Sequence, residues 1–372
     1  MDWNTMKTAV ILCSFISTVL SLPISLDTSC KQEMSNTGSS VVSCTFEFTN
    51  RGREGYCLLK RNTPLEGLAS PFITVSHDGV PLEYQGIDFY RFPPERHDFV
   101  YLSMGESITA TVHINDMFTF SSDGIYKIQY THPLWYFPKN KMGSHIGEIK
   151  AIKSILSNEP IYINIKNLQQ LSRPVKKELF KDEGVQLEVK GCGMVTLLKG
   201  SKKERNSVLT VQKRLCSQLK KTRSTISNSD LYRVWFGEYN EERSNKVREI
   251  FQNIIDGLSS HGITYDLNGD RCTPAVPAYT LTNVPSTVYL CPVFHQFVTT
   301  MDCTNIGISS KESIILHKLS QVFGSTQNYN VYGQDNNKEL AVTSPEAAVT
   351  HSDSYECYYC HSYGHFDHMI YM

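Results

Sequence analysis

Residues 309–326 read SSKESIILHKLSQVFGST, and this stretch decides the fold of the second half of the chain. Its apolar residues recur every three or four positions, at Ile315, Leu316, Leu319 and Val322. That spacing is typical of the apolar face of a helix. Ser309-Ser310-Lys311-Glu312 is typical of a capping box, in which a serine hydroxyl accepts from the backbone N–H three residues on and Glu312 bonds back to the cap N–H. The stretch therefore predicts an amphipathic helix with His317 in its middle.

Two earlier stretches beyond Cys192 have the same helical period. Their apolar stripes are Val208, Val211, Leu215 and Leu219, and then Val247, Ile250, Phe251, Ile254, Ile255 and Leu258. A repeated helical stripe predicts a mainly helical second domain over residues 191–372.

The first half of the chain has period two instead. Apolar residues alternate with polar ones in Cys44/Phe46/Phe48, Ile108/Ala110/Val112/Ile114, Tyr126/Ile128/Tyr130 and Ile161/Ile163/Ile165. Turn sequences such as His77-Asp78-Gly79 and Ser122-Asp123-Gly124 separate the runs, as expected for antiparallel strands. Residues 22–170 therefore predict a β-sandwich domain. The charged residues 171–190, with Arg173-Pro174, predict an exposed connector, and the whole chain is expected to be α+β.

The N-terminus predicts a secretory leader. Lys7 precedes an apolar core over residues 9–20, which is too short to span a bilayer, and Val19 and Ser21 supply small residues for cleavage. We expect residues 1–21 to be removed and the protein to be secreted and extracellular. No later run approaches the roughly 20 apolar residues of a membrane helix, so no membrane span is expected.

Charge and cysteine content agree with an extracellular globular protein. The chain of 372 residues carries 36 Lys and Arg against 37 Asp and Glu, so no global field draws it to nucleic acid. Loss of Cys13 with the leader leaves ten of the 11 cysteines, and an even number in an oxidising compartment favours disulfides.

Several motifs in the second half resemble, in order and approximate spacing, the deuterolysin and peptidyl-Lys metalloendopeptidase family, the aspzincins. They are Trp235-Phe236-Gly237-Glu238-Tyr239, Thr287-Val288-Tyr289-Leu290-Cys291, His317, Gly324-Ser325-Thr326, Tyr332-Gly333-Gln334 and Ser344-Pro345-Glu346-Ala347-Ala348-Val349. The resemblance implies a zincin-like, lysine-specific metalloendopeptidase domain with a His/Cys-rich C-terminal tail. In the first half, residues 59–67 and 78–81 resemble the β domain that precedes the peptidase in some relatives, where a processing cut near Lys190 is an open alternative.

The family's zinc chemistry requires His-Glu-x-x-His on a helix, with an Asp beyond a Gly-Thr turn as third ligand and the Glu as general base. This chain keeps His317, as a remnant ligand, but has Lys318 at the base position and Gln321 at the second His position. The Asp position falls on Asn328 when counted from Thr326, or on Tyr329 when counted from Tyr332. The resemblance therefore implies a peptidase fold in which three of the four side chains essential for zinc binding and catalysis are replaced.

One imidazole cannot hold a catalytic zinc, which normally has three protein ligands, and a lysine ammonium beside it would repel the cation. We therefore expect no cofactor and no hydrolysis, and we interpret the chain as a pseudo-peptidase that acts as a binding protein. The alternative is an active zinc-dependent endopeptidase that cleaves at lysine with ligands from elsewhere. A third interpretation is metal binding by the tail, residues 357–368, which contains His361 and His365.

Other family positions keep polar residues. Asp353 and Glu356 fall on the two acidic positions that recognise the substrate lysine in lysine-specific relatives, and Tyr332 falls on the tyrosine that stabilises the oxyanion. Acids three apart on a helix share a face and can jointly accept from an ammonium. The resemblance thus implies a cleft that binds lysine side chains or lysine-bearing protein segments; the plainer interpretation is a solvated acidic edge.

A second candidate surface is basic. Residues 199–223 contain nine basic residues, offset by one acid, Glu204: Lys199, Lys202, Lys203, Arg205, Lys213, Arg214, Lys220, Lys221 and Arg223. A solvated helix face explains them, and a patch for sulfated glycans is the sharper hypothesis.

For the disulfides, the resemblance implies a bond between Cys272 and Cys291. Cys192 also matches a family cysteine whose usual partner is missing, which leaves Cys216 or Cys303 as its partner. Cys30, Cys44 and Cys57 are an odd set, so one of them must pair elsewhere or remain a thiol.

Overall fold

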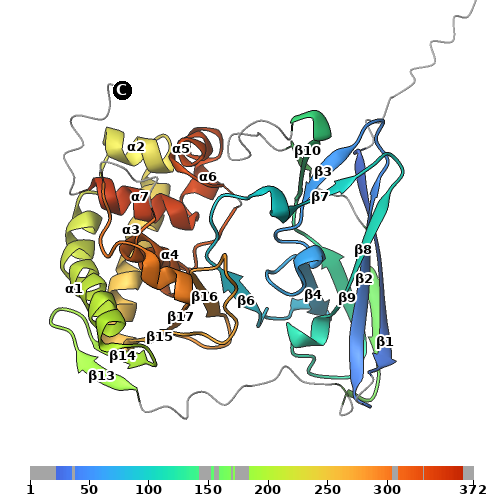
Figure 1. Cartoon of the computed structure of the whole chain (residues 1–372), viewed down its shortest axis with the longest axis horizontal. Coiled ribbons are helices and arrows are strands. Elements are labelled where there is room, and N and C mark those ends of the chain that lie inside the picture. The colour runs from blue at the N-terminus through green and yellow to red at the C-terminus, as the bar shows by residue number, and fades with distance from the viewer. Residues whose placement is uncertain are drawn as a thin grey trace, which may run out of the picture.

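The computed structural model describes residues 22–35, 38–141, 152–154, 159–168, 171, 184–303, 309–329 and 331–362. The expected leader, residues 1–21, and most of the tail, from residue 363 on, lie outside the described residues. Two bodies lie side by side, an all-β N-terminal half and a C-terminal half of helices around a sheet (Figure 1). The predicted α+β class is confirmed.

Antiparallel sheets build the N-terminal half, as the period-two pattern predicts. Their strand orders are β1(Ile24–Met34)-β2(Ser40–Asn50)-β8(Ser107–His113), then β11(Ile152–Ser154)-β10(Leu134–Pro138)-β3(Tyr56–Leu59)-β7(Phe99–Leu102), and β12(Ile161–Ile165)-β9(Gly124–Tyr130)-β4(Ile73–His77)-β5(Val80–Pro81). The alternating residues Phe46, Phe48, Tyr126 and Ile128 are buried in one shared core. That burial is why the runs form strands, because period two places every second side chain on the core face.

The C-terminal half has a mixed sheet of order β13(Val185–Glu188)-β14(Met194–Leu198)-β15(Ile263–Asp266)-β17(Thr287–Leu290)-β16(Ala278–Leu281)-β6(Ile87–Phe89). Strands β14, β15 and β17 are parallel, whereas β16 runs antiparallel to β17 and to β6. The helices are α1(Lys202–Ser224), α2(Asp230–Phe236), α3(Glu241–Asp256), α4(Lys311–Gly324), α5(Gln334–Thr343), α6(Pro345–Ala348) and α7(Ser352–His361). The predicted stripes of α1, α3 and α4 lie in one core with the sheet.

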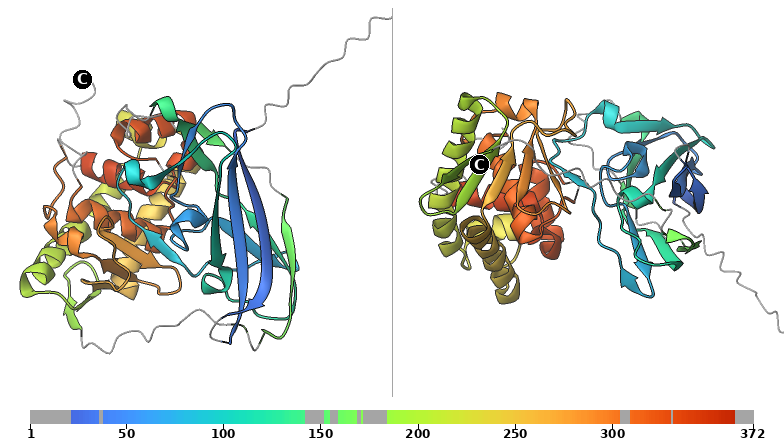
Figure 2. Two further views of the ribbon diagram at one scale, coloured as in Figure 1. Left: turned by 45° about the vertical axis from the view of Figure 1, so that its right-hand side comes forward. Right: turned by 90° about the horizontal axis from the view of Figure 1, so that it is seen from below.

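Two boundaries differ from the prediction. The predicted connector 171–190 ends in strand β13, which pairs with β14; most of its first part, residues 172–183, lies outside the described residues. Strand β6 comes from the predicted β domain 22–170 but pairs with β16 of the C-terminal sheet (Figures 1 and 2). Composition marks where a chain is polar, but it does not say which sheet a short strand joins.

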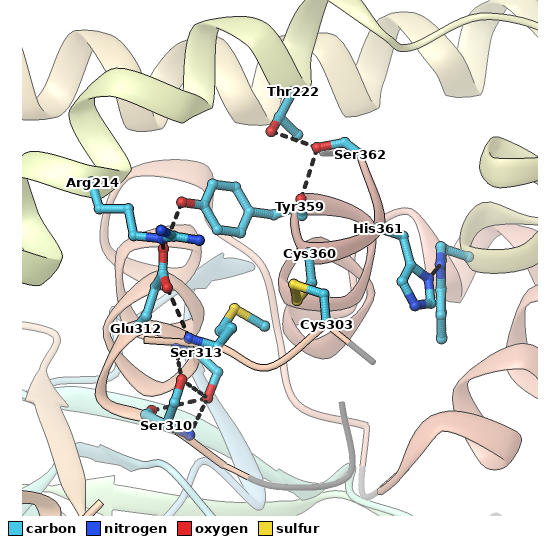
Figure 3. The surroundings of a disulfide bond; sticks show 12 residues. Arg214, Thr222, Cys303, Ser310, Glu312, Ser313, Tyr359, Cys360, His361 and Ser362 are labelled. Atoms are coloured by element: carbon cyan, nitrogen blue, oxygen red, sulfur yellow. Dashed lines mark hydrogen bonds and ion pairs between the residues drawn. A yellow bond between two sulfur atoms is a disulfide. The ribbon is translucent and has the colours of Figure 1, made fainter. Parts of the chain in front are cut away.

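The cap of α4 lies one residue later than predicted. Ser310 is the N-cap, and its hydroxyl accepts from the N–H of Ser313, whose own hydroxyl accepts from the Ser310 N–H. Glu312, predicted to complete the box, is instead buried and accepts from the Arg214 guanidinium at 2.8 Å and the Tyr359 hydroxyl at 2.8 Å (Figure 3). A buried carboxylate needs such donors, and they join α1, α4 and α7.

Disulfides link Cys30 to Cys44, Cys192 to Cys216, Cys272 to Cys291 and Cys303 to Cys360. The Cys272–Cys291 bond is the one that the family resemblance implies, and Cys216 is the partner of Cys192. Within the described part of the chain, Cys57 and Cys357 are buried thiols. The Cys303–Cys360 bond ties the loop before α4 to α7 (Figure 3).

Among the described helices, none is long and apolar enough to cross a membrane.

The end of α7 is fixed by a buried ring pair. Trp235 Nε1 donates to His361 Nδ1 at 3.0 Å, so this nitrogen must be unprotonated. Burial, with a smaller effect from Lys338, lowers the pKa of His361 to about 4. His361, proposed above as a tail metal ligand, therefore uses one ring nitrogen inside the core; His365 and His368 lie outside the described residues.

Acid should therefore destabilise the fold through His361. The unfolded imidazole has a pKa near 6.5, so protons bind preferentially to the unfolded chain between about pH 6.5 and pH 4, and stability falls as pH falls through this window. A His361→Asn variant keeps an acceptor for Trp235 but does not titrate. We expect thermal unfolding to show a larger loss of Tm from pH 6.5 to 4.5 in the wild type than in the variant; equal losses would contradict this account.

Candidate functional site

Helix α4 carries the candidate site through the centre of the C-terminal half, between the sheet and α7 (Figure 1). Residues 310–320 of this helix are buried almost all round. His317 and Lys318 therefore have their side chains inside the protein, and every polar atom on them requires a partner.

His317 lies against one acid and one aromatic ring. Its Nδ1 is 2.8 Å from Asp353 Oδ1, which is an ion-pair distance. The Tyr90 ring contacts the imidazole edge-on, with centroids 4.7 Å apart. On the far side of Asp353, His351 Nε2 is 3.8 Å from Oδ2 and 3.1 Å from Asn337 Oδ1. His317 is thus packed and paired within the core.

The two acids of α7 have opposite protonation preferences. Burial alone would raise the pKa of Asp353, but its hydrogen bond with His317 and the charges of His351 and His317 lower it. Burial, and then the charge of Asp353, raises the pKa of Glu356 well above its ordinary value. The ionised form is therefore favoured at Asp353, and the protonated form at Glu356. Their low exposure excludes the plainer interpretation of a solvated acidic edge.

Lys318 is the residue that the resemblance assigns to the position of the family's general base. Its Nζ is fully buried and donates to Asp88 O at 2.9 Å, to Gln321 Oε1 at 2.7 Å and to Asp88 Oδ1 at 3.4 Å. Burial lowers the pKa of Lys318 to about 8, against the opposing effect of Asp88. At neutral pH the ammonium is still mostly charged, held between α4 and β6.

These contacts decide whether the family's zinc fits. The Gln321 oxygen, at the second ligand position that the resemblance implies, accepts from the Lys318 ammonium. Neither Asn328 nor Tyr329 supplies a carboxylate, and the Tyr329 hydroxyl bonds Thr350 Oγ1 at 2.8 Å. The residues at the family's ligand positions therefore do not fit zinc.

A different set of donors does converge. One ligand atom each from His317, Asp353 and Glu356 lies within 4.8 Å of the others, the one such group among the described residues. His317 is from α4 and both acids are from α7. The group differs from the family's ligands except for His317, and Glu356 must lose a proton before it can bind a cation.

Tyr332 lies under a cation from the N-terminal half. It is 8% exposed, and the Arg61 guanidinium carbon is 5.5 Å from its ring centroid. Burial raises the pKa of Tyr332, with Arg61 opposing. Arg61 also donates to Asp98 Oδ2 at 2.8 Å. The predicted oxyanion tyrosine is therefore covered by the N-terminal half.

Sequence reasoning missed the residues that come from the first half. Asp88 and Tyr90 lie against Lys318 and His317, although nothing in Ile87-Asp88-Phe89-Tyr90 identifies the partner sheet. The one available signal is the lysine at a base position, because a buried ammonium needs an acceptor from somewhere.

Some of the basic residues over 199–223 make contacts inside the protein. Lys199 Nζ donates to Asp266 Oδ2 at 2.9 Å and Arg214 Nε to Glu312 Oε1 at 2.8 Å. Exposed members remain at Lys202, Lys203, Lys213, Lys220 and Lys221. The surface open to an anionic glycan is thus smaller than the sequence alone predicts.

The different protonation of the two acids has a measurable consequence. Glu356→Gln should change the free energy of unfolding by less than about 0.5 kcal/mol, because an amide resembles a protonated acid in shape. Asp353→Asn should cost about 1–3 kcal/mol, because it removes the anion beside His317 and His351. Urea unfolding at pH 7 measures both, and a Glu356→Gln loss as large as that of Asp353→Asn would contradict the assignment.

Comparison with known proteins agrees with the resemblance found in the sequence. A sequence profile described as lysine-specific metallo-endopeptidase (Aspzincin_M35) matches residues 221–360. An extracellular protease of Aeromonas hydrophila is 26% identical over 321 residues, which cover 85% of this chain and 86% of that protein. Peptidyl-Lys metalloendopeptidases are 32% identical over 136 residues in Armillaria mellea, 36% of each chain, and 32% identical over 127 residues in Grifola frondosa, 34% of each.

Among solved structures, a zinc peptidase from Grifola frondosa is 26% identical and matches with a TM-score of 0.38, covering 44% of this chain and 97% of its own. The family assignment therefore rests on sequence, and the profile match lies within the C-terminal half. Residues 221–360 belong to the lysine-specific metallo-endopeptidase, or aspzincin, family.

Proposed function

We propose that this chain is a secreted pseudo-peptidase, a non-hydrolytic member of its family that acts as an extracellular binding protein. The observation that carries the proposal is the buried Lys318, which donates to Asp88 O at 2.9 Å and Gln321 Oε1 at 2.7 Å. Peptide hydrolysis by this family requires a carboxylate base and a metal-activated water. A fixed ammonium can serve as neither, and it repels a cation at the neighbouring ligand positions.

Support for secretion comes from three directions. The leader-like residues 1–21 are one, and the disulfides of both halves are another, since such bonds persist in oxidising compartments. The third is the relative from Aeromonas hydrophila that is described as extracellular.

We propose further that the acid pair of α7, Asp353 and Glu356, recognises lysine side chains. Glu356 Oε2 is buried without a hydrogen-bond partner, and the ionised Asp353 lies close by with 15% of its side chain exposed. A lysine ammonium offers three donors and one positive charge, and would allow Glu356 to ionise. An extracellular protein or peptide segment that bears lysine is the ligand class that fits these acceptors.

The first test measures metal and hydrolysis together. Purified full-length protein should contain well under one equivalent of zinc and should not cleave a lysine-containing protein substrate, even after incubation with zinc. Stoichiometric zinc together with chelator-sensitive cleavage would overturn the proposal in favour of an active zinc-dependent metalloendopeptidase. Metal without cleavage would refute the metal-free part and favour the group formed by His317, Asp353 and Glu356 as the metal site.

The second test measures lysine recognition. A lysine-rich peptide should bind the wild type, and acetylation of its lysines should abolish binding because it removes the charge. The double variant Asp353→Asn/Glu356→Gln should lose at least tenfold in affinity, about 1.4 kcal/mol. Asp335→Asn, at a fully exposed acid of α5, is the matched control. If the double variant is folded and binds as well as the parent, lysine recognition at this site is wrong.

A further inference from the structure

Residues 84–92 of the N-terminal half cross into the C-terminal half as an extended segment. Ile87, Asp88 and Phe89 pair antiparallel with Leu281, Thr280 and Tyr279. The N–H of Tyr90 donates to Ala278 O at 2.8 Å, and Thr282 Oγ1 donates to Tyr84 O at 2.7 Å. The segment thus adds a last strand to the sheet beyond β16 (Figure 2).

The side chains of this segment alternate between two surroundings. Asp88 and Tyr90 contact Lys318 and His317, which are consecutive residues of α4. Phe89, between them, contacts the Tyr279 ring with centroids 5.9 Å apart. Such alternation along main-chain pairing is how an extended peptide is recognised when it is added to a sheet edge.

The contacts are those of a buried ligand. Tyr90 is 6% exposed and belongs to the core of the C-terminal half, against which Phe92 packs. Phe92 also contacts Phe297, with ring centroids 5.5 Å apart. Lys318 Nζ donates to both the backbone carbonyl and the side-chain carboxylate of Asp88. A buried ammonium favours an acidic residue here and penalises an apolar or basic one, since a lost partner leaves the charge uncompensated.

We propose that the β16 edge, with Lys318 and His317 behind it, is a binding site for an extended peptide that carries an acidic residue followed two positions later by an aromatic one. In the intact chain the site is filled by the chain's own residues 84–92. A tethered segment has an effective concentration of roughly millimolar, so it excludes a free peptide of similar affinity. The inference goes beyond lysine recognition and does not rest on it.

The test releases the segment in the full-length chain. The variant Asp88→Lys/Tyr90→Ser removes the two side chains that contact α4. A fluorescent peptide of residues 84–94, YQGIDFYRFPP, should bind this variant at least about tenfold more tightly than the wild type in an anisotropy titration. The peptide with its Asp replaced by Lys should not bind. The matched control is Asp27→Lys/Tyr162→Ser, at exposed positions of the same half, which should behave as the wild type.

A second experiment keeps the wild-type strand β6 and cuts only the covalent connection between the two halves of the chain. A protease site inserted between residues 176 and 177 allows the purified protein to be nicked. Nicked protein should bind the labelled peptide at least about tenfold more tightly than intact protein, and Lys318→Ala should abolish this gain.

Either of two results overturns the proposal: nicking leaves the peptide affinity unchanged, or the peptide with Lys in place of Asp binds as well as the parent peptide. The nicked wild type decides the question if the Asp88→Lys/Tyr90→Ser variant does not fold. Lysine-rich peptides are absent from both arms, so a negative result here leaves the acid-pair proposal standing on its own test.

Discussion

A buried ammonium constrains this molecule more than any other single group. Lys318 has no water to solvate it, so its donors must find acceptors within the protein, and removal of any one acceptor would leave charge uncompensated. Those acceptors come from Gln321, one turn along the same helix, and from Asp88, which is distant in sequence. Lys318, which the resemblance assigns to the base position, thus connects the two halves of the chain. The Gln321 side chain meets the same constraint, because its oxygen accepts from the ammonium.

Most of the charged side chains near Lys318 lie close to a group of opposite charge. The Lys318 ammonium is bonded to Asp88, His317 lies beside the ionised Asp353, and Arg61 covers Tyr332 while bonded to Asp98. Burial, and then the charge of Asp353, raises the pKa of Glu356, because a second buried anion beside Asp353 would be unfavourable. The two basic side chains here, Lys318 and Arg61, are both bonded to carboxylates of the N-terminal half, Asp88 and Asp98.

The sequence was informative wherever a repeated pattern or several separated motifs carried the signal. Alternation at Phe46 and Phe48 predicted strands, and the stripe through Ile315 and Leu319 predicted α4, because burial selects the period directly. The order of motifs identified the family and the Cys272–Cys291 bond. Local sequence patterns did not predict the contacts of a residue or a short strand where several partners were equally compatible with the sequence. Glu312 could cap its helix or pair with Arg214 and Tyr359, and β6 could pair with either half; no residue within a few positions distinguishes these outcomes.

The shared strand also affects how the chain must fold. Strand β6 (Ile87–Phe89) pairs with β16 (Ala278–Leu281), and Asp88 also bonds Lys318 across 230 positions, so the C-terminal sheet gains its last strand through contacts of very high sequence separation. During synthesis the N-terminal half emerges first, and β6 has no sheet to join until β16 has been made. Such long-range pairing slows folding, and until it forms each half exposes a strand edge that could pair with another chain. The two halves, separable in composition and period, therefore depend on each other for a closed sheet, and they are expected to mature as one cooperative unit.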